Sequence, residues 1–174
     1  FESVNARSIS GRLQCSTRPI FTCYENMEEL RKEFLDFAYE FYSQYVESYS
    51  SSEHINPCLV LPLSYIEFAR EETNLFINHM DLSMAEPKDF YMEAGNGERE
   101  RVFSDTIGIE PERAKAIFID LFLYSHGIAV LAAAQKITLD RSHIEKMAAN
   151  MLTALIRQEK PDWTLFVSGI TESI

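Results

Sequence analysis

The sequence predicts an all-α protein with a short helical N-terminal segment and a larger helical remainder. Apolar residues recur every three or four positions through much of the chain, and no run alternates with the period of two expected for a half-buried strand. Residues that commonly cap helices precede several of these periodic runs. The 174 residues are enough to bury a substantial core, so the fold needs no disulfide or metal to hold it.

Two short helices are predicted at the N-terminus. Asn5 is a suitable N-cap for a helix over residues 6–13. Ser16 can cap a second short helix that ends near residue 24, and Pro19 is tolerated in its first turn. The apolar side chains of the two helices are expected to face inward: Ile9, Leu13, Ile20 and Tyr24.

A long amphipathic helix is predicted from residue 27 onward. Asn26 and Glu29 have the spacing of a capping box, and aromatic residues follow in helical register. Pro57 and Pro62 are expected to bracket a connector. A helix of moderate length over residues 65–80 should come next.

A second long helix is predicted from Pro111 to Ile137. It is apolar almost all round, so we expect it to be covered on both sides. The stretch resembles a membrane span in length. However, it contains Asp120 and His126, and a carboxylate near the middle of a bilayer costs about 2.5–3.5 kcal/mol on insertion scales. A buried helix in a protein without a membrane partner is therefore expected.

The charge distribution separates the N-terminus from the rest of the chain. The formal net charge is −11, which argues against a protein that coats nucleic acid or anionic membrane with its whole surface. Residues 1–26 carry a net charge of +1, and the remainder carries −12. The three cysteines lack CxxC spacing, which favours reduced thiols in a cytoplasm, and no cofactor or metal is expected.

The N-terminal residues resemble the DNA-binding signature of the TetR family. Two short helices joined by a turn have the geometry of a helix-turn-helix. The elements of the family signature follow in the same order here: Ile9-Ser10, Ser16, Ile20-Phe21, Tyr24, Asn26 and Glu28-Glu29-Leu30. The resemblance implies a helix-turn-helix DNA-binding domain over residues 1–26, without the family's first helix, and a ligand-binding and dimerisation domain over residues 27–174.

The resemblance also implies a function and a DNA-contacting surface. A member of this family is a homodimeric transcription regulator, in many cases a ligand-responsive repressor, that binds a palindromic double-stranded DNA operator. Arg18 is the best candidate for reading a base, because a guanidinium can bond a guanine edge in two places for roughly 1–3 kcal/mol of discrimination. The residues placed at the DNA by the resemblance are Arg7, Ser16, Thr17, Arg18, Pro19, Phe21, Thr22, Asn26 and Met27.

The helical remainder supplies candidates for an effector pocket and a dimer interface. A small apolar or aromatic effector is expected, in a cavity lined by Phe41, Tyr45, Tyr65, Phe68, Phe76, Phe90, Phe103, Phe118, Phe122 and His126. The last helix, capped by Asp140 or Ser142, is expected to pair with its predecessor in a four-helix bundle of two subunits. The predicted interface residues are Ile128, Leu131, Ala132, Ile144, Met147, Met151 and Leu155.

Two other classes of function remain open. Asp120 and His126 are possible acid–base groups, but a separation of six does not place them on one helix face, and we expect no enzyme. A helical dimer that binds a small molecule or a protein, but no longer binds DNA, is the main alternative. It is favoured by the missing first helix, and by Phe21 and Met27 at places where the family commonly has tyrosine and lysine.

Overall fold

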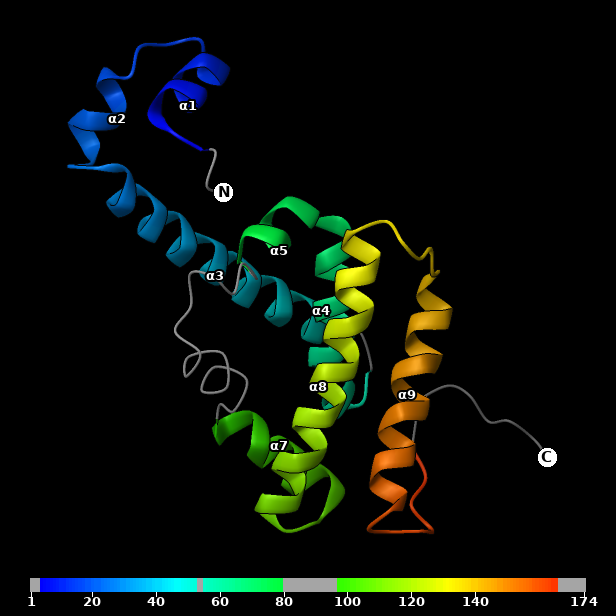
Figure 1. Ribbon diagram of the computed structural model, residues 1–174. Coiled ribbons are helices and arrows are strands. Elements are labelled where there is room, and N and C mark those ends of the chain that lie inside the picture. The colour runs from blue at the N-terminus through cyan, green and yellow to red at the C-terminus, as the bar shows by residue number, and fades with distance from the viewer. Residues whose placement is uncertain (1–3, 53–54, 80–96, 166–174) are drawn as a thin grey trace. The chain divides into compact units, whose positions relative to one another are not determined.

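The computed structural model describes residues 4–52, 55–79 and 97–165 (Figure 1). Within these ranges the chain forms helices and no strand, so the all-α class predicted from the sequence is confirmed. The helices are α1 (Ala6–Leu13), α2 (Arg18–Cys23), α3 (Met27–Ser52), α4 (Pro57–Glu71), α5 (Thr73–His79), α7 (Gly97–Ile107), α8 (Pro111–Ala133) and α9 (Arg141–Arg157).

Contacts divide the chain into two compact units, Phe1–Ser43 and Gln44–Ile174. The division falls inside α3, so the first part of this helix belongs to the N-terminal unit and its last residues to the second unit. The sequence predicts a domain boundary between residues 26 and 27, just before α3. This boundary stays a prediction.

Side-chain caps define the start of α1. Asn5 Oδ1 accepts hydrogen bonds from the backbone N–H groups of Arg7 and Ser8, at 3.1 and 3.0 Å. The Asn5 N–H in turn donates to Ser8 Oγ at 3.0 Å. At the other end, Gln14 closes the helix in the left-handed conformation with a φ of 53°. The N-cap predicted at Asn5 is therefore confirmed, and two of the N–H groups that a helix start leaves unpaired are satisfied.

The starts of α2 and α3 are capped differently. Thr17 occupies the N-cap position of α2, one residue later than predicted, and makes no side-chain capping bond. In α3, Asn26 Oδ1 accepts from the N–H groups of Glu28 and Glu29, both at 2.9 Å. Glu29 Oε2 accepts from the N–H of Glu25 at 2.7 Å, one residue before the position in a standard capping box. These bonds fix the point where the long helix begins.

The connector predicted between Pro57 and Pro62 is wrong, because both prolines lie in α4. Pro57 is the first residue of α4, where its missing N–H is not needed, and Asn56 Oδ1 caps the helix by accepting from the N–H of Cys58 at 2.9 Å. Pro62 lies inside the helix and is buried. The helix loses a backbone hydrogen bond at Pro62 but continues, since almost every residue from Cys58 to Ala69 is packed in the core.

The core of the second unit lies where α8 packs against α4 and α7, with α9 beside α8 (Figure 1). Its most deeply buried side chains come from these helices and α5: Phe68, Phe76, Phe118, Ile66, Leu121, Ile144, Leu152 and Ile156. Asp140 caps α9 through a 2.8 Å bond from the His143 N–H, and the bonds from His143 lower the pKa of Asp140. Of the two N-caps considered from the sequence, Asp140 and Ser142, Asp140 holds this position, and the predicted helix is present.

α8 is buried on one face only. Leu123, Val130 and Leu131 keep 48%, 43% and 45% of their surface exposed, and Asp120 is exposed as well. The described residues of one chain cover one side of this helix, so its predicted cover on both sides stays a prediction. Within the described residues α8 is the one helix long and apolar enough to cross a membrane, a property that core helices of soluble proteins share.

Candidate functional site

The predicted DNA-contacting residues lie on the surface of the N-terminal unit. Phe21 is 52% exposed, whereas its neighbour Ile20 on α2 is only 7% exposed. α2 is therefore anchored through the face that carries Ile20, and its opposite face is exposed to solvent. Thr17 and Met27 are half-buried, and the rest of the predicted set is exposed: Arg7, Ser16, Arg18, Pro19, Phe21, Thr22 and Asn26.

Polar contacts brace this unit. Thr22 Oγ1 donates to the Arg18 carbonyl at 2.9 Å, which leaves the Thr22 methyl and the Arg18 side chain on the surface. Arg31 Nη2 of α3 donates to the Val4 carbonyl at 3.4 Å, so the residues before α1 are tied to the long helix.

Leu13, expected to face inward, is 67% exposed. The expectation for Leu13 was wrong because a two-turn helix buries few of its side chains. In α1 the buried residues are Ala6 and Ser10.

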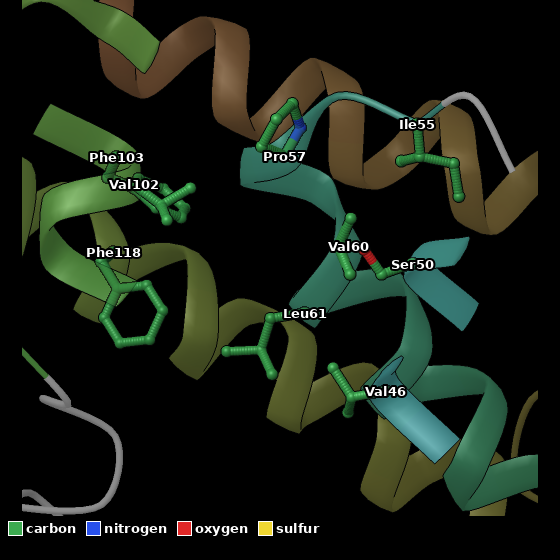
Figure 2. Close-up of a pocket in the computed structure, with 9 residues that line it drawn as sticks. All are labelled: Val46, Ser50, Ile55, Pro57, Val60, Leu61, Val102, Phe103 and Phe118. Atoms are coloured by element: carbon green, nitrogen blue, oxygen red, sulfur yellow. The ribbon is translucent and has the colours of Figure 1, made fainter. Parts of the chain in front are cut away.

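The second unit contains an apolar pocket of about 280 Å³ (Figure 2). It lies between the end of α3, the first turns of α4, and the facing sides of α7 and α8. Its volume is close to the lower limit of typical small-molecule sites, roughly 300 Å³. Its lining is apolar except for one hydroxyl, and consists of Val46, Ser50, Ile55, Pro57, Val60, Leu61, Val102, Phe103 and Phe118.

Phe103 and Phe118 are the members of the predicted effector pocket that line this cavity. The other aromatic candidates are placed differently. Tyr65, Phe68 and Phe76 are at most 4% exposed and pack in the core, and Phe122 stacks between Phe118 and His126. Phe41 is half-buried in the N-terminal unit, Tyr45 lines a different pocket, and Phe90 lies outside the described residues. The aromatic side chains therefore mainly fill the core by contacting one another.

Tyr65 and His126 form a polar contact inside this aromatic cluster. Tyr65 Oη lies 2.9 Å from His126 Nδ1. Burial lowers the pKa of His126, because the charged imidazolium is poorly solvated there. Asp120, the other member of the acid–base pair considered above, is exposed on a different face of α8.

Burial also raises the pKa of the Cys58 thiol to about 12, which leaves its reactive thiolate unpopulated at neutral pH.

The predicted dimer residues divide into two groups. Ile128, Ile144 and Leu155 are buried within the single subunit, at 6%, 1% and 9% exposure. Ala132, Met147 and Met151 are half-buried, and Leu131 is exposed. Leu123 and Val130, which the sequence interpretation missed, accompany Leu131 on the uncovered face of α8. The period of the apolar residues did not distinguish this face from the core, because both faces of the helix are apolar.

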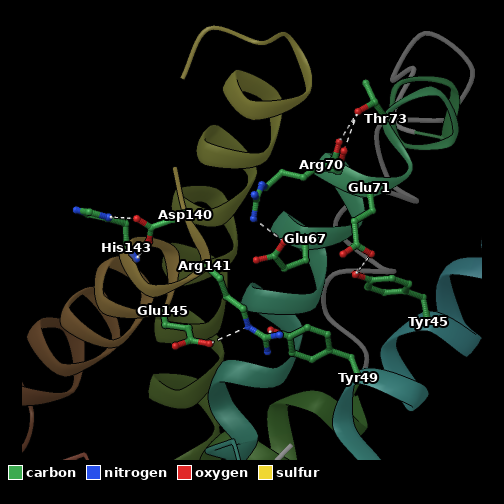
Figure 3. A network of polar contacts seen from close by, with 11 residues as sticks. Tyr45, Tyr49, Glu67, Arg70, Glu71, Thr73, Asp140, Arg141, His143 and Glu145 are labelled. Carbon is green, nitrogen blue, oxygen red and sulfur yellow. Dashed lines mark hydrogen bonds and ion pairs between the residues drawn. The ribbon is translucent and has the colours of Figure 1, made fainter. Parts of the chain in front are cut away.

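A second pocket, of about 260 Å³, lies between α3, α4 and the start of α9 (Figure 3). It is polar, and the buried residue Glu67 is among those that line it. The sequence interpretation did not identify it. The spacing of Glu67 and Arg70, three apart on a helix, was the available indication, and such pairs are common on exposed helix faces.

Comparisons with protein-family models, curated proteins and solved structures found no match for this chain. Among the described residues, no three His, Cys, Asp or Glu side chains come together in an arrangement that could hold a metal ion.

Proposed function

We propose that this chain is a DNA-binding transcription regulator similar to the TetR family, with α2 as its recognition helix. The observation that carries the proposal is the exposure of one face of α2. A phenylalanine that keeps half its surface in solvent costs hydrophobic free energy unless it has a partner, and Phe21 lies on the same short helix as exposed Arg18 and Thr22. An aromatic ring, a guanidinium and hydroxyl or methyl groups are the groups that read base edges in the major groove.

The N-terminal unit has suitable support for such a helix. Ile20 anchors α2, and the capped start of α3 follows it after a short turn. The backbone N–H groups at the start of a long helix attract phosphate, although Asn26 already satisfies two of them. The +1 charge of residues 1–26, against −12 for the remainder, favours contact with DNA through this end of the chain.

The proposal includes a homodimer formed through α8 and α9. Leu123, Val130 and Leu131 are separated by helical spacings and form an exposed apolar stripe on α8. The helix α9 lies beside α8 (Figure 1). Gly127 lies on the same face, and a methyl group added there would meet nothing within 4 Å, so a partner helix has room to approach. Two such subunits would set their recognition helices about 34–36 Å apart, one turn of DNA.

The apolar pocket supports a ligand-responsive regulator. Its lining favours a small apolar effector, and Val46 and Ser50 of the lining belong to α3, the helix whose first residues follow α2 in the chain. An effector that binds one tilt of α3 more tightly than another would shift the population of DNA-competent molecules. We propose that the protein is a repressor that leaves its operator DNA when the effector binds.

The alternative is a helical dimer that binds a small molecule or a protein and does not bind DNA. It is favoured by the half-buried Met27 at a position where a lysine would meet phosphate, which leaves few cations near α2. The apolar pocket and the uncovered face of α8 would serve this function equally well.

A selection from random DNA duplexes, followed by a salt titration on the enriched sequence, distinguishes the two functions. A regulator enriches a palindrome and binds it with an affinity that falls steeply as the salt concentration rises, because each phosphate contact releases counterions. A binding module enriches no sequence. Uniform weak binding to every duplex would also contradict the proposal, since it would show charge attraction without base readout.

A further inference from the structure

The apolar pocket of the second unit runs from an exposed rim to a buried floor. Ser50 and Pro57 at the rim are exposed, whereas Leu61, Phe103 and Phe118 at the floor are at most 9% exposed (Figure 2). Ser50 supplies the single side-chain hydroxyl among the described residues that line the pocket. A molecule that fills this space therefore meets one polar group at the rim and hydrocarbon or aromatic groups everywhere else.

The charge of the lining restricts the ligand. None of the described residues that line the pocket carries a charge. An ionised group that enters such a space loses its hydration and gains no opposite charge in return, which is costly. A carboxylate or an ammonium group is therefore disfavoured. A neutral hydroxyl or carbonyl group loses much less, and the Ser50 hydroxyl at the rim can exchange a hydrogen bond with it.

A second apolar space lies behind the floor. Leu61 and Phe118 line it together with Pro62, Leu121 and Phe122, and it is too narrow for a water molecule. Such a gap leaves the atoms around it without close contacts on one side. Pro62 lacks the N–H that would bond to the preceding turn, so α4 bends most easily beside Leu61.

The two spaces share a wall that is able to move. A small shift of Leu61 and Phe118 would join the pocket to the inner gap, because these two residues line both. The gap is narrow, so it admits a single hydrocarbon chain more easily than a ring. The combined space therefore fits a long, thin molecule better than a compact one.

We propose that the apolar pocket binds a neutral molecule with an unbranched hydrocarbon chain and one terminal hydroxyl or carbonyl group. The polar end lies beside Ser50 at the rim, and the chain runs along Leu61 and Phe118 toward the inner gap. The pocket volume of about 280 Å³ restricts the occupant to a small molecule. This inference rests on the proposed function, because it names the chemical class of the effector that the regulator would sense.

The test is calorimetric titration of the full chain at neutral pH with a series of alcohols: 1-butanol, 1-hexanol, 1-octanol and 1-decanol. Octanoate and octylamine have the same chain length as 1-octanol but carry a charge. The branched isomer 2-ethyl-1-hexanol has the same atoms as 1-octanol in a wider shape. These comparisons separate the effects of chain length, charge and shape.

Two pairs of variants locate the binding site. Val60→Phe narrows the pocket at a half-buried position, and Ile77→Phe adds the same ring at an exposed position on α5 outside it. Leu121→Ala widens the inner gap, and Leu152→Ala removes the same group from a buried position on α9 that lines neither space. Thermal unfolding checks that each variant is folded.

One saturable site per chain, with an affinity that rises roughly fourfold for each added methylene until the space is full, supports the proposal. Octanoate and octylamine should bind at least about tenfold more weakly than 1-octanol, since each would bring an unpaired charge into the pocket. The branched isomer should also bind more weakly. Val60→Phe should abolish binding, Leu121→Ala should shift the preference toward 1-decanol, and the two control variants should leave the affinities unchanged.

Three results would overturn the proposal: no saturable binding of any alcohol, binding of octanoate or octylamine as tight as that of 1-octanol, or unchanged affinity in a folded Val60→Phe variant. If a variant fails to fold, the comparisons among ligands on the wild-type protein still decide. The titration needs no DNA. A protein that binds 1-octanol but no DNA supports this inference and contradicts the regulator, whereas one that binds DNA but no alcohol overturns this inference alone.

Discussion

The hydroxyl of Tyr65 on α4 and Nδ1 of His126 on α8 lie 2.9 Å apart within a cluster of aromatic side chains. The contact joins the two helices that form most of the core of the second unit. Two polar atoms are thereby satisfied in a region where each would otherwise lose its solvation.

Tyr65→Phe should lower the free energy of unfolding by about 1 kcal/mol, since it removes one buried hydrogen bond and preserves the ring packing. Chemical denaturation at neutral pH measures this change. Phe68→Leu provides a contrast, because it reduces packing volume in the same core without altering a polar contact. An unchanged unfolding free energy for Tyr65→Phe would show that water or another group replaces the lost hydroxyl at no cost.

His126 should make stability dependent on pH near neutrality. Its folded-state pKa is lowered from 6.5, so its contribution is fully present above pH 6.5 and is lost as the pH falls through the folded-state value. His126→Asn keeps a side chain that can meet the Tyr65 hydroxyl but does not titrate. The wild-type protein should therefore lose stability relative to this variant as the pH falls below about 6.5, as measured by thermal unfolding. A difference that stays constant as the pH falls would contradict the burial of the imidazole.

Glu67 should have an effect in the acidic range. Its folded-state pKa is raised above 4.5, so the stability associated with its protonated form is fully present below pH 4.5 and is lost as the pH rises through the folded-state value. The melting temperature of the wild-type protein relative to Glu67→Gln should thus increase as the pH falls from neutrality toward 4.5. Glu112→Gln, on the surface, should show no such trend.

Arg18→Ala should reduce sequence preference more than it reduces attraction to DNA. If Arg18 reads a guanine, its loss costs about 1–3 kcal/mol of discrimination, or roughly five- to 150-fold in relative affinity. Arg12→Ala is the matched control, because Arg12 is exposed on α1 but is not among the predicted DNA contacts. It should leave both the sequence preference and the salt dependence of binding nearly unchanged. Equal effects of both substitutions would contradict base reading by Arg18.

Leu131→Glu should separate the proposed dimer into monomers. A carboxylate placed in an apolar interface loses its solvation, and a cost of about 3 kcal/mol would raise the dimer dissociation constant by about two orders of magnitude. Sedimentation velocity measures the mass of the particle. Ile77→Glu, which alters a side chain 53% exposed on α5, should leave the assembly intact. A wild-type protein with the mass of one subunit would remove the basis of this prediction.

Local patterns predicted much of the fold, and longer-range packing determined what they missed. The caps at Asn5, Asn26 and Asp140 were predictable because each acts on N–H groups within three residues. Pro62 was misinterpreted as part of a connector, since its effect on a helix depends on whether tertiary contacts hold that helix in place. Tertiary contacts also decide which face of α8 is buried.

The candidate sites show the same limit. The exposure of most α2 residues was predictable, because a helix this short can bury few side chains, and Ile20 is its buried residue. The aromatic residues gave no comparable guide, because a ring that lines a cavity and a ring that fills a core have the same sequence pattern. Glu67 is a single carboxylate in an apolar helix, and only the arrangement of α3, α4 and α9 shows that it is buried beside a pocket.

Pro62 divides α4 into two parts that serve different cavities. Pro57, Val60 and Leu61 before the proline line the apolar pocket, whereas Glu67, Arg70 and Glu71 after it line the polar one. The backbone hydrogen bond missing at Pro62 makes this the point where the helix bends most easily. Each end of α4 can thus shift without transmitting the full displacement to the other, so a molecule that enters the apolar pocket should leave the shape of the polar pocket nearly unchanged.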